Sequence, residues 1–99
     1  MQQYAEYGGS RGGFFACGLA SAQLVPFNGH RKKLIICNDA ANACYLVKGD
    51  GPAIANAGIT LLPGGTWILE PDYRGYLWKG AIQCISLVAA QNLTWQEDW

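Results

Sequence analysis

Short apolar runs recur along this sequence at a spacing of roughly 8 to 12 residues, and turn-forming residues separate them. Several runs, among them LIIC, ITLL and TWIL, are rich in the β-branched residues that favour strands. No stretch shows the apolar period of an amphipathic helix. About seven short strands with this spacing are typical of a sandwich or barrel. We therefore predict an all-β chain that forms a compact antiparallel β-sandwich or a jelly-roll-like barrel.

The turn signals predict how neighbouring strands connect. Leu34–Cys37 is followed, after a short stretch of small and polar residues, by a second strand within Ala43–Gly49, and this pattern predicts a hairpin. Within Gly58–Leu69, Pro63 presets φ for the first central position of a turn and Gly64 supplies the positive φ of the second. We therefore predict a second hairpin there.

The other segments are less regular. Phe14–Phe27 is compatible with a strand or a short helix, whereas Asp50–Gly58 has the composition of a loop. Tyr76–Ala89 predicts one or two strands with a kink at Gly80, since an isolated glycine in a strand marks a bulge or corner. Asn92–Trp99 predicts a final strand.

Two runs, Leu34–Cys37 and Trp67–Leu69, are apolar on both faces of the expected strand. One face of an antiparallel sheet normally meets water. The second face of these runs therefore needs cover, either from the other sheet or from another chain.

We expect two regions along the chain. Residues 1–13 are rich in Gly and Tyr and have no strand or helix period, which indicates a flexible N-terminal arm. Residues 14–99 form the single β-sandwich domain.

The charge balance excludes several classes of partner. Seven basic and seven acidic residues cancel, so nothing attracts the chain to nucleic acid or to an anionic membrane, and we expect neither as a partner.

No apolar run reaches the ~18 to 20 residues that span a bilayer. The opening residues lack the order of a signal peptide, so we expect the chain to be used without export.

The sequence offers little for catalysis or metal binding, and we expect neither an enzyme nor a cofactor. The four cysteines lack the spacing of a zinc site or a small disulfide framework, which indicates free, buried thiols. His30 lies in an expected exposed turn, and the pairs Glu70/Asp72 and Glu97/Asp98 are expected in solvent-facing loops. The cluster Arg31-Lys32-Lys33 predicts a solvated strand edge.

Aromatic residues are the class that stands out, with four Trp, five Tyr and three Phe in 99 residues. We expect Trp67, Trp78 and Trp95 in the core and Tyr73 and Tyr76 on the surface. So small an interior leaves some rings for subunit contacts, where Trp and Tyr are favoured. The residues expected there are Tyr76, Trp95 and Trp99.

Two long segments together resemble a known group of proteins. RKKLIICNDAANACYLVKGDGPAIANAGITLLPGGTWIL, followed by YLWKGAIQCISLVAAQNLTWQEDW, is similar to small virion domains of tailed bacteriophages. The shared order is a basic strand, an Asn-Asp turn, a Tyr-Leu strand, a Pro-Ala loop, Pro-Gly-Gly, an aromatic strand, a Gly-Ala-Ile strand and a closing Leu-Thr strand. It covers Arg31 to Glu97, about two thirds of the chain.

The resemblance implies a β-sandwich that acts as a structural module without enzymatic activity or cofactor. It implies a capsid decoration (cement) protein on the outside of the virion, assembled in the host cytoplasm. Such a protein forms a homo-oligomer, with a trimer expected, and binds the major coat protein. In this interpretation Tyr4, Tyr7 and Arg11 of the N-terminal arm contact the coat protein or a neighbouring subunit.

Two alternatives remain open at this stage. One is a tail or baseplate component of the same kind of particle. The other is a carbohydrate-binding β-sandwich in which Trp67, Tyr73, Tyr76 and Trp78 form a stacking platform.

Overall fold

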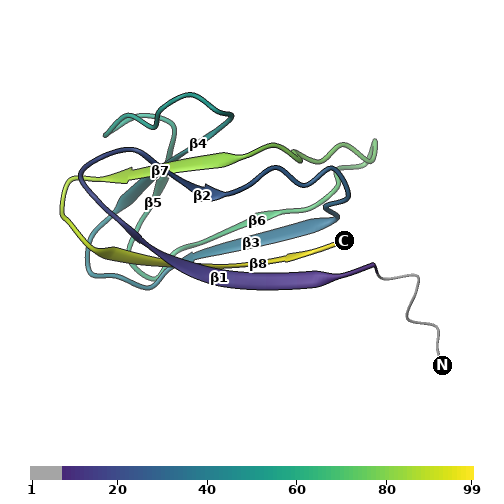
Figure 1. Cartoon of the computed structure of the whole chain (residues 1–99), viewed down its shortest axis with the longest axis horizontal. Helices are drawn as coiled ribbons and strands as arrows, with labels where there is room; N and C mark the ends of the chain where they lie inside the picture. The colour runs from purple at the N-terminus through teal and green to yellow at the C-terminus, as the bar shows by residue number, and fades with distance from the viewer. Residues whose placement is uncertain (1–7) are drawn as a thin grey trace.

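A computed structural model describes residues 8–99, which form eight strands in two four-stranded sheets (Figure 1). Every strand pairing is antiparallel, so the prediction of an all-β sandwich is confirmed. The described residues contain no helix, and so none that is long and apolar enough to cross a bilayer. The strands are β1 (Ser10–Cys17), β2 (Ala22–Val25), β3 (Lys33–Asn38), β4 (Cys44–Lys48), β5 (Ile59–Leu61), β6 (Thr66–Leu69), β7 (Ile82–Ser86) and β8 (Gln91–Asp98).

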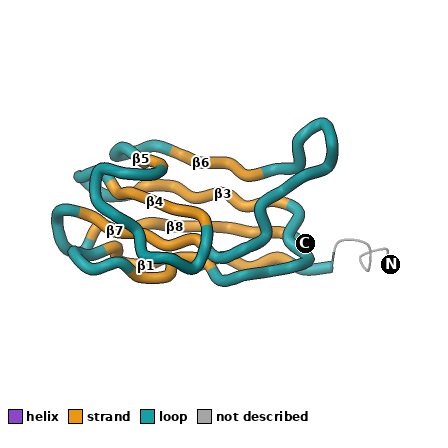
Figure 2. Tube along the Cα trace, turned by 90° about the horizontal axis from the view of Figure 1, so that it is seen from above, coloured by secondary structure: helices purple, strands orange, loops and turns teal. Residues whose placement is uncertain are grey.

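The strand order is that of a jelly roll. One sheet, which we call sheet A, has the order β1-β8-β3-β6, and the other, sheet B, has the order β2-β7-β4-β5. The first strand pairs with the last, the second with the seventh, the third with the sixth and the fourth with the fifth. The chain is therefore one long antiparallel hairpin rolled into two layers. Figure 2 looks onto these layers and shows β6, β3, β8 and β1 side by side in that order.

Both predicted hairpins are wrong, although both turns exist. β3 lies in sheet A and β4 in sheet B, and likewise β6 lies in sheet A and β5 in sheet B. The Pro63-Gly64 turn does form, with Gly64 at φ 77° and the Gly65 amide donating to the Leu62 carbonyl. Each turn carries the chain across the sandwich instead of folding it back within one sheet.

A buried asparagine holds the corner where these two crossings leave sheet A. The Asn38 side-chain amide donates to the carbonyl oxygens of Asn42 and Leu61, at 2.9 and 2.8 Å. Its backbone amide donates to Gly65, and its own carbonyl accepts from Gly64. One residue at the end of β3 thus bonds both connections, which satisfies backbone groups that no sheet ladder pairs.

The core lies between the sheets and follows the alternation of the strands. Along β3, for example, Leu34 and Ile36 are fully buried while the residues between them are only half-buried. Three tryptophans expected in the core, Trp67, Trp78 and Trp95, are partly buried and pack against its margin. Other core residues with no exposed surface are Cys17, Val25, Cys44, Leu46, Ile82, Cys84 and Leu93.

The boundary expected at residue 13 needs a correction, because residues 10–13 belong to β1. The β1–β8 ladder runs without a break from Cys17 opposite Gln91 to Ser10 opposite Asp98. Gly9 continues it by exchanging two backbone hydrogen bonds of 2.8 Å with Trp99. The β-propensity of these residues is low because they are rich in glycine, and pairing with the final strand overrides it.

Candidate interaction surface

The outer face of sheet A carries apolar side chains where an antiparallel sheet usually carries polar ones. Residues that face each other across antiparallel strands point to the same side of the sheet. One row across the sheet joins Phe14, Thr94, Cys37 and Thr66, and the next joins Gly12, Gln96, Ile35 and Ile68. We call Phe14, Ile35, Cys37, Ile68, Thr66 and Thr94 the outer apolar patch.

The outer apolar patch is open to solvent in the described part of the chain. Phe14 is 76% exposed and Ile68 is 48% exposed, while Ile35 and Cys37 are half-buried. A shallow depression of about 250 Å³ lies on it, lined by Ile35, Cys37, Thr94, Trp95 and Gln96, none of which is charged. Such a surface suits contact with another apolar surface better than recognition of a charged ligand.

The outer apolar patch contains the second face of the two apolar runs, Leu34–Cys37 and Trp67–Leu69. Leu34 and Ile36 of the first run face sheet B, and Ile35 and Cys37 face outward. In the second run Ile68 faces outward, opposite Ile35. The other sheet therefore covers one face of each run, and none of residues 8–99 forms a layer over the second.

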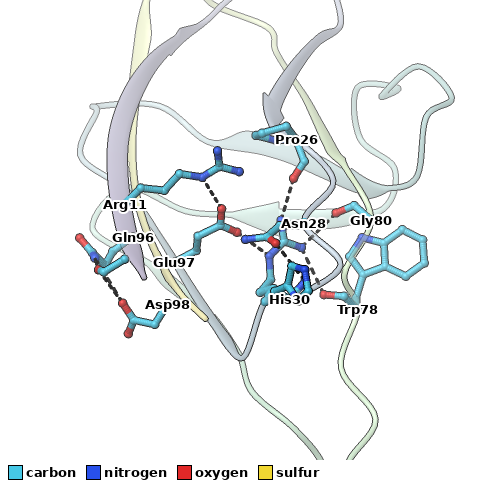
Figure 3. A network of polar contacts seen from close by, with 11 residues as sticks. Arg11, Pro26, Asn28, His30, Trp78, Gly80, Gln96, Glu97 and Asp98 are labelled. Atoms are coloured by element: carbon cyan, nitrogen blue, oxygen red, sulfur yellow. Dashed lines mark hydrogen bonds and ion pairs between the residues drawn. The ribbon is translucent and has the colours of Figure 1, made fainter. Parts of the chain in front are cut away.

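Two residues expected in solvent form a buried ion pair instead. Arg31 and Glu97 have no solvent-exposed side-chain surface, and Arg31 Nε donates to Glu97 Oε1 at 2.7 Å. Arg11 Nε reaches the other carboxylate oxygen at 2.5 Å (Figure 3). The solvated strand edge predicted for Arg31-Lys32-Lys33 is thus wrong for Arg31, and the loop predicted for Glu97/Asp98 is wrong because both residues lie in β8.

The remaining donors of Arg31 bond backbone carbonyls of two loops. Its terminal nitrogens donate to the carbonyl oxygens of Pro26, Trp78 and Gly80, at 2.8 to 3.2 Å. Sheet A extends beyond sheet B at this end, so these loops close the sandwich over β8 (Figure 1). Both oxygens of the Glu97 carboxylate and all three nitrogens of the Arg31 guanidinium have partners, which indicates a structural clamp.

Trp95 and Trp99, expected in subunit contacts, flank Arg11 of their own chain. The Arg11 guanidinium carbon lies 5.9 Å from the centre of the Trp95 ring and 5.5 Å from that of Trp99, within the range of cation–π contacts. Gly9 makes room for Trp99, since a Cβ there would come within 2.6 Å of the ring. The Arg11 side chain thus contacts residues of its own domain. Tyr4 and Tyr7 lie outside the described residues.

Tyr76, the third residue expected in a subunit contact, lies apart from the two tryptophans in sequence, on the loop between β6 and β7. Asp72 organises this loop, because its Oδ1 accepts the backbone amides of Arg74 and Tyr76. These bonds, that of Tyr76 foremost, lower the pKa of the Asp72 carboxyl. Tyr73, which is 94% exposed, and Tyr76 are on the surface as predicted.

The four aromatic residues of the carbohydrate-binding alternative do not form one platform. Trp67 is opposite Ile36 and so points to the inner side of sheet A. Trp78 bonds its indole N–H to the Ala81 carbonyl and packs against the core margin. Only Tyr73 and Tyr76 present exposed rings.

A second hollow, of about 360 Å³, lies where the described chain begins. Its lining contains Trp99 together with His30, Lys32 and Lys79, and it also includes Gly8, Gly29 and Arg31. His30 is exposed in a turn, as predicted, with its backbone amide bonded to the Asn28 side chain. Arg31 contributes no free charge here, because Glu97 and the loop carbonyls occupy it.

The cysteines are free thiols, as predicted from their spacing, and three of them meet the core. Burial raises the pKa of Cys44 to about 12, and a side-chain hydrogen bond with Cys84 together with burial raises the pKa of Cys17. Cys17 and Cys44 are therefore protonated and unreactive at neutral pH. Nowhere within residues 8–99 do three or more His, Cys, Asp or Glu side chains gather as a metal site would require.

The outer apolar patch is the feature of the described residues on which a functional assignment can rest. No protein-family model, curated protein or solved structure matches this chain.

Proposed function

We propose that this chain is a structural protein of a tailed-phage particle, most simply a capsid decoration protein, and that it binds the coat protein through the outer apolar patch. The single observation that carries the proposal is the uncovered apolar face of sheet A. An exposed patch of this kind on a small domain marks a protein contact. The phage assignment comes from the resemblance of Arg31–Glu97 to virion domains, and a jelly roll is an architecture that capsid proteins use.

Fold alone does not imply function, so the chemistry of the surface has to support the choice. The Arg31–Glu97 ion pair is buried and the raised pKa values of Cys17 and Cys44 keep these thiols protonated, so the proposal does not rely on catalysis by either group. Jelly rolls also include lectins. Trp67 points to the inner side of sheet A and Trp78 packs against the core, which leaves two exposed rings, Tyr73 and Tyr76, for a sugar to stack on. We therefore favour the protein-binding role.

The proposal places the protein on the outside of the head, as a homo-oligomer on the coat lattice. Several weak attachments of one oligomer then act together through effective concentration. A trimer is the oligomer that the resemblance implies. A tail or baseplate location uses the same surface, and cryo-microscopy of particles that contain the chain distinguishes the two.

The patch is tested with matched surface variants. Ile68→Lys places a charge in the outer apolar patch, and Ile54→Lys places one at an exposed position of the loop between β4 and β5. Both variants should fold, and only Ile68→Lys should lose binding to purified particles in a co-sedimentation assay. Absence of the protein from particles by mass spectrometry, or equal binding by both variants, would refute the proposal.

A further inference from the structure

Strand β1 forms an edge of sheet A that lacks the usual protection against pairing with another strand. It is eight residues long, about 27 Å. Protected edges are short, bulged or covered, or carry Pro or charged side chains. The one charged side chain of β1, Arg11, is paired with Glu97 of its own chain. The other three edges in the described structure are short, since β2 and β6 have four residues and β5 has three, and β2 also carries a bulge.

The register shows which backbone groups of β1 are free. Gly9 and Trp99 exchange both hydrogen bonds, so in an antiparallel ladder the odd-numbered residues of β1 bond β8. The even-numbered residues, Ser10, Gly12, Phe14 and Ala16, then direct their N–H and C=O groups away from β8. No other strand within residues 8–99 pairs with that side.

From this geometry we infer that β1 pairs antiparallel with β1 of a second copy of the chain, which joins the two A sheets into one. A two-fold axis through Gly13 brings Ser10 opposite Ala16 and Gly12 opposite Phe14 of the partner subunit. All four free residues of each copy are then used, and each pair exchanges two hydrogen bonds. A shift by two residues in either direction leaves one of the four without a partner.

The side chains fit the same register. Phe14, which is 76% exposed, lies opposite a glycine of the other copy, and an aromatic ring covers such a glycine well. At the axis Gly13 meets its own copy in a non-hydrogen-bonded position, where side chains approach most closely and glycine has none. The sequence SRGGFFAC is thus complementary to itself in antiparallel orientation, and this favours a second copy over an unrelated strand.

This inference is independent of the proposed phage role, because it concerns the isolated protein. It also differs from the trimer that the resemblance implies, since a two-fold strand pairing makes a dimer. The outer faces of both copies remain on the same side of the joined sheet. The outer apolar patches therefore form one larger surface that can still meet a coat protein.

Sedimentation and amide hydrogen exchange of the full chain test the inference together. We expect a dimer whose four even-numbered β1 amides, those of residues 10, 12, 14 and 16, become protected as concentration rises. Dilution to the monomer should leave only the odd-numbered amides of β1 protected. A monomer at every concentration, or an oligomer in which the even-numbered amides exchange freely, overturns the inference.

Two variants sharpen the test. Phe14→Lys replaces the ring that covers Gly12 of the other copy with a charge on the pairing edge, and should raise the dimer dissociation constant about tenfold or more. Ser10→Pro removes one outward N–H per copy without removing a backbone hydrogen bond to β8, and should also weaken the dimer. It also removes the side-chain hydrogen bonds of the Ser10 hydroxyl with Asp98 and Gln96. Tyr73→Lys changes an exposed ring on a distant loop and should leave it intact. Equal dimerisation by all three variants contradicts the inference, while particle binding judged by Ile68→Lys is unaffected by that outcome.

Discussion

Arg31 Nε and Glu97 Oε1 lie 2.7 Å apart, and neither side chain has any surface exposed to solvent. The pair joins β8, the last strand of the chain, to the loop that precedes β3. Through its other nitrogens Arg31 also holds the loop before β7. Arg11 of β1 bonds the other oxygen of the Glu97 carboxylate. Four parts of the chain that are far apart in sequence thus meet at the Arg31–Glu97 pair.

Removing the carboxylate charge should strongly destabilise the fold. Glu97→Gln leaves Arg31 buried without a counter-charge, and breaking such a pair from one side costs about 3–5 kcal/mol. Asp98→Asn is the matched control, since Asp98 is the neighbouring acidic residue in β8 and is exposed. Urea denaturation should show a large loss for the first variant and less than about 1 kcal/mol for the second. Similar losses would mean that the buried pair is not the clamp we describe.

Asn38 should be nearly as sensitive, because it bonds both crossings between the sheets. Asn38→Ala leaves the carbonyl oxygens of Asn42 and Leu61 without this donor, with an expected loss of about 2–4 kcal/mol. Asn28→Ala removes a single contact to the exposed His30 amide and should cost about 1 kcal/mol or less. Thermal unfolding of both variants measures the difference. A tolerated Asn38→Ala would show that the corner is held by other contacts.

Two glycines with similar backbone angles should respond differently to alanine. Gly58 and Gly64 have φ of 79° and 77°. A Cβ on Gly58 would lie 2.5 Å from the Leu46 carbonyl oxygen, whereas a Cβ on Gly64 meets nothing within 4 Å. Gly64→Ala should therefore lower the free energy of unfolding by only about 1–2 kcal/mol, the cost of holding an alanine in the left-handed conformation. Gly58→Ala should cost clearly more by denaturation, because the β4–β5 ladder has to shift, and equal costs would contradict the close approach.

Stability should fall in alkali because the buried Cys44 thiol has to ionise on unfolding. The pKa of Cys44 is about 12 in the folded protein and 9.0 ordinarily, so the folded state holds the proton between these values. The protonated Cys44 thiol therefore contributes fully to the free energy of unfolding below about pH 9. This contribution is lost as the pH rises toward 12, and the free energy of unfolding falls by at most about 1.4 kcal/mol per pH unit.

Denaturation curves at several pH values above 9 measure this slope. Cys44→Ala should make this slope shallower, because the variant lacks the buried thiol that ionises. At neutral pH a thiol reagent should modify Cys37 of the native protein first and the buried thiols only after unfolding. An unchanged slope in Cys44→Ala would show that this thiol does not ionise on unfolding.

The strands were largely predictable, whereas their partners were not. The β-branched cores of β3, β6 and β7 are visible as local patterns, and Pro63-Gly64 correctly marks a turn. That turn joins different sheets, because β5 finds its partner in β4 and β6 in β3. A local signal specifies a change of direction but not the ladder that each flank enters.

The site was predictable to a similar degree. The two-sided apolar runs indicated that a face of Leu34–Cys37 needs cover, and the outer apolar patch is that face. The free edge of β1 was missed, since Gly12 and Gly13 argue against a strand when taken alone. The alternation of β8 would have placed Glu97 on the inner face with Leu93 and Trp95, had the acidic residues not suggested solvent.

The sequence by itself determined that this chain is all-β, where most strands begin and end, and that its apolar surface exceeds what one layer of contacts covers. These properties depend on residue type and on a period of two, which act over a few neighbouring residues. Only the tertiary structure decided the jelly-roll order, the burial of Arg31 against Glu97 and the exposure of the β1 edge. Each of these depends on contacts between segments that are far apart in the sequence. Local sequence patterns do not specify which distant segments come into contact.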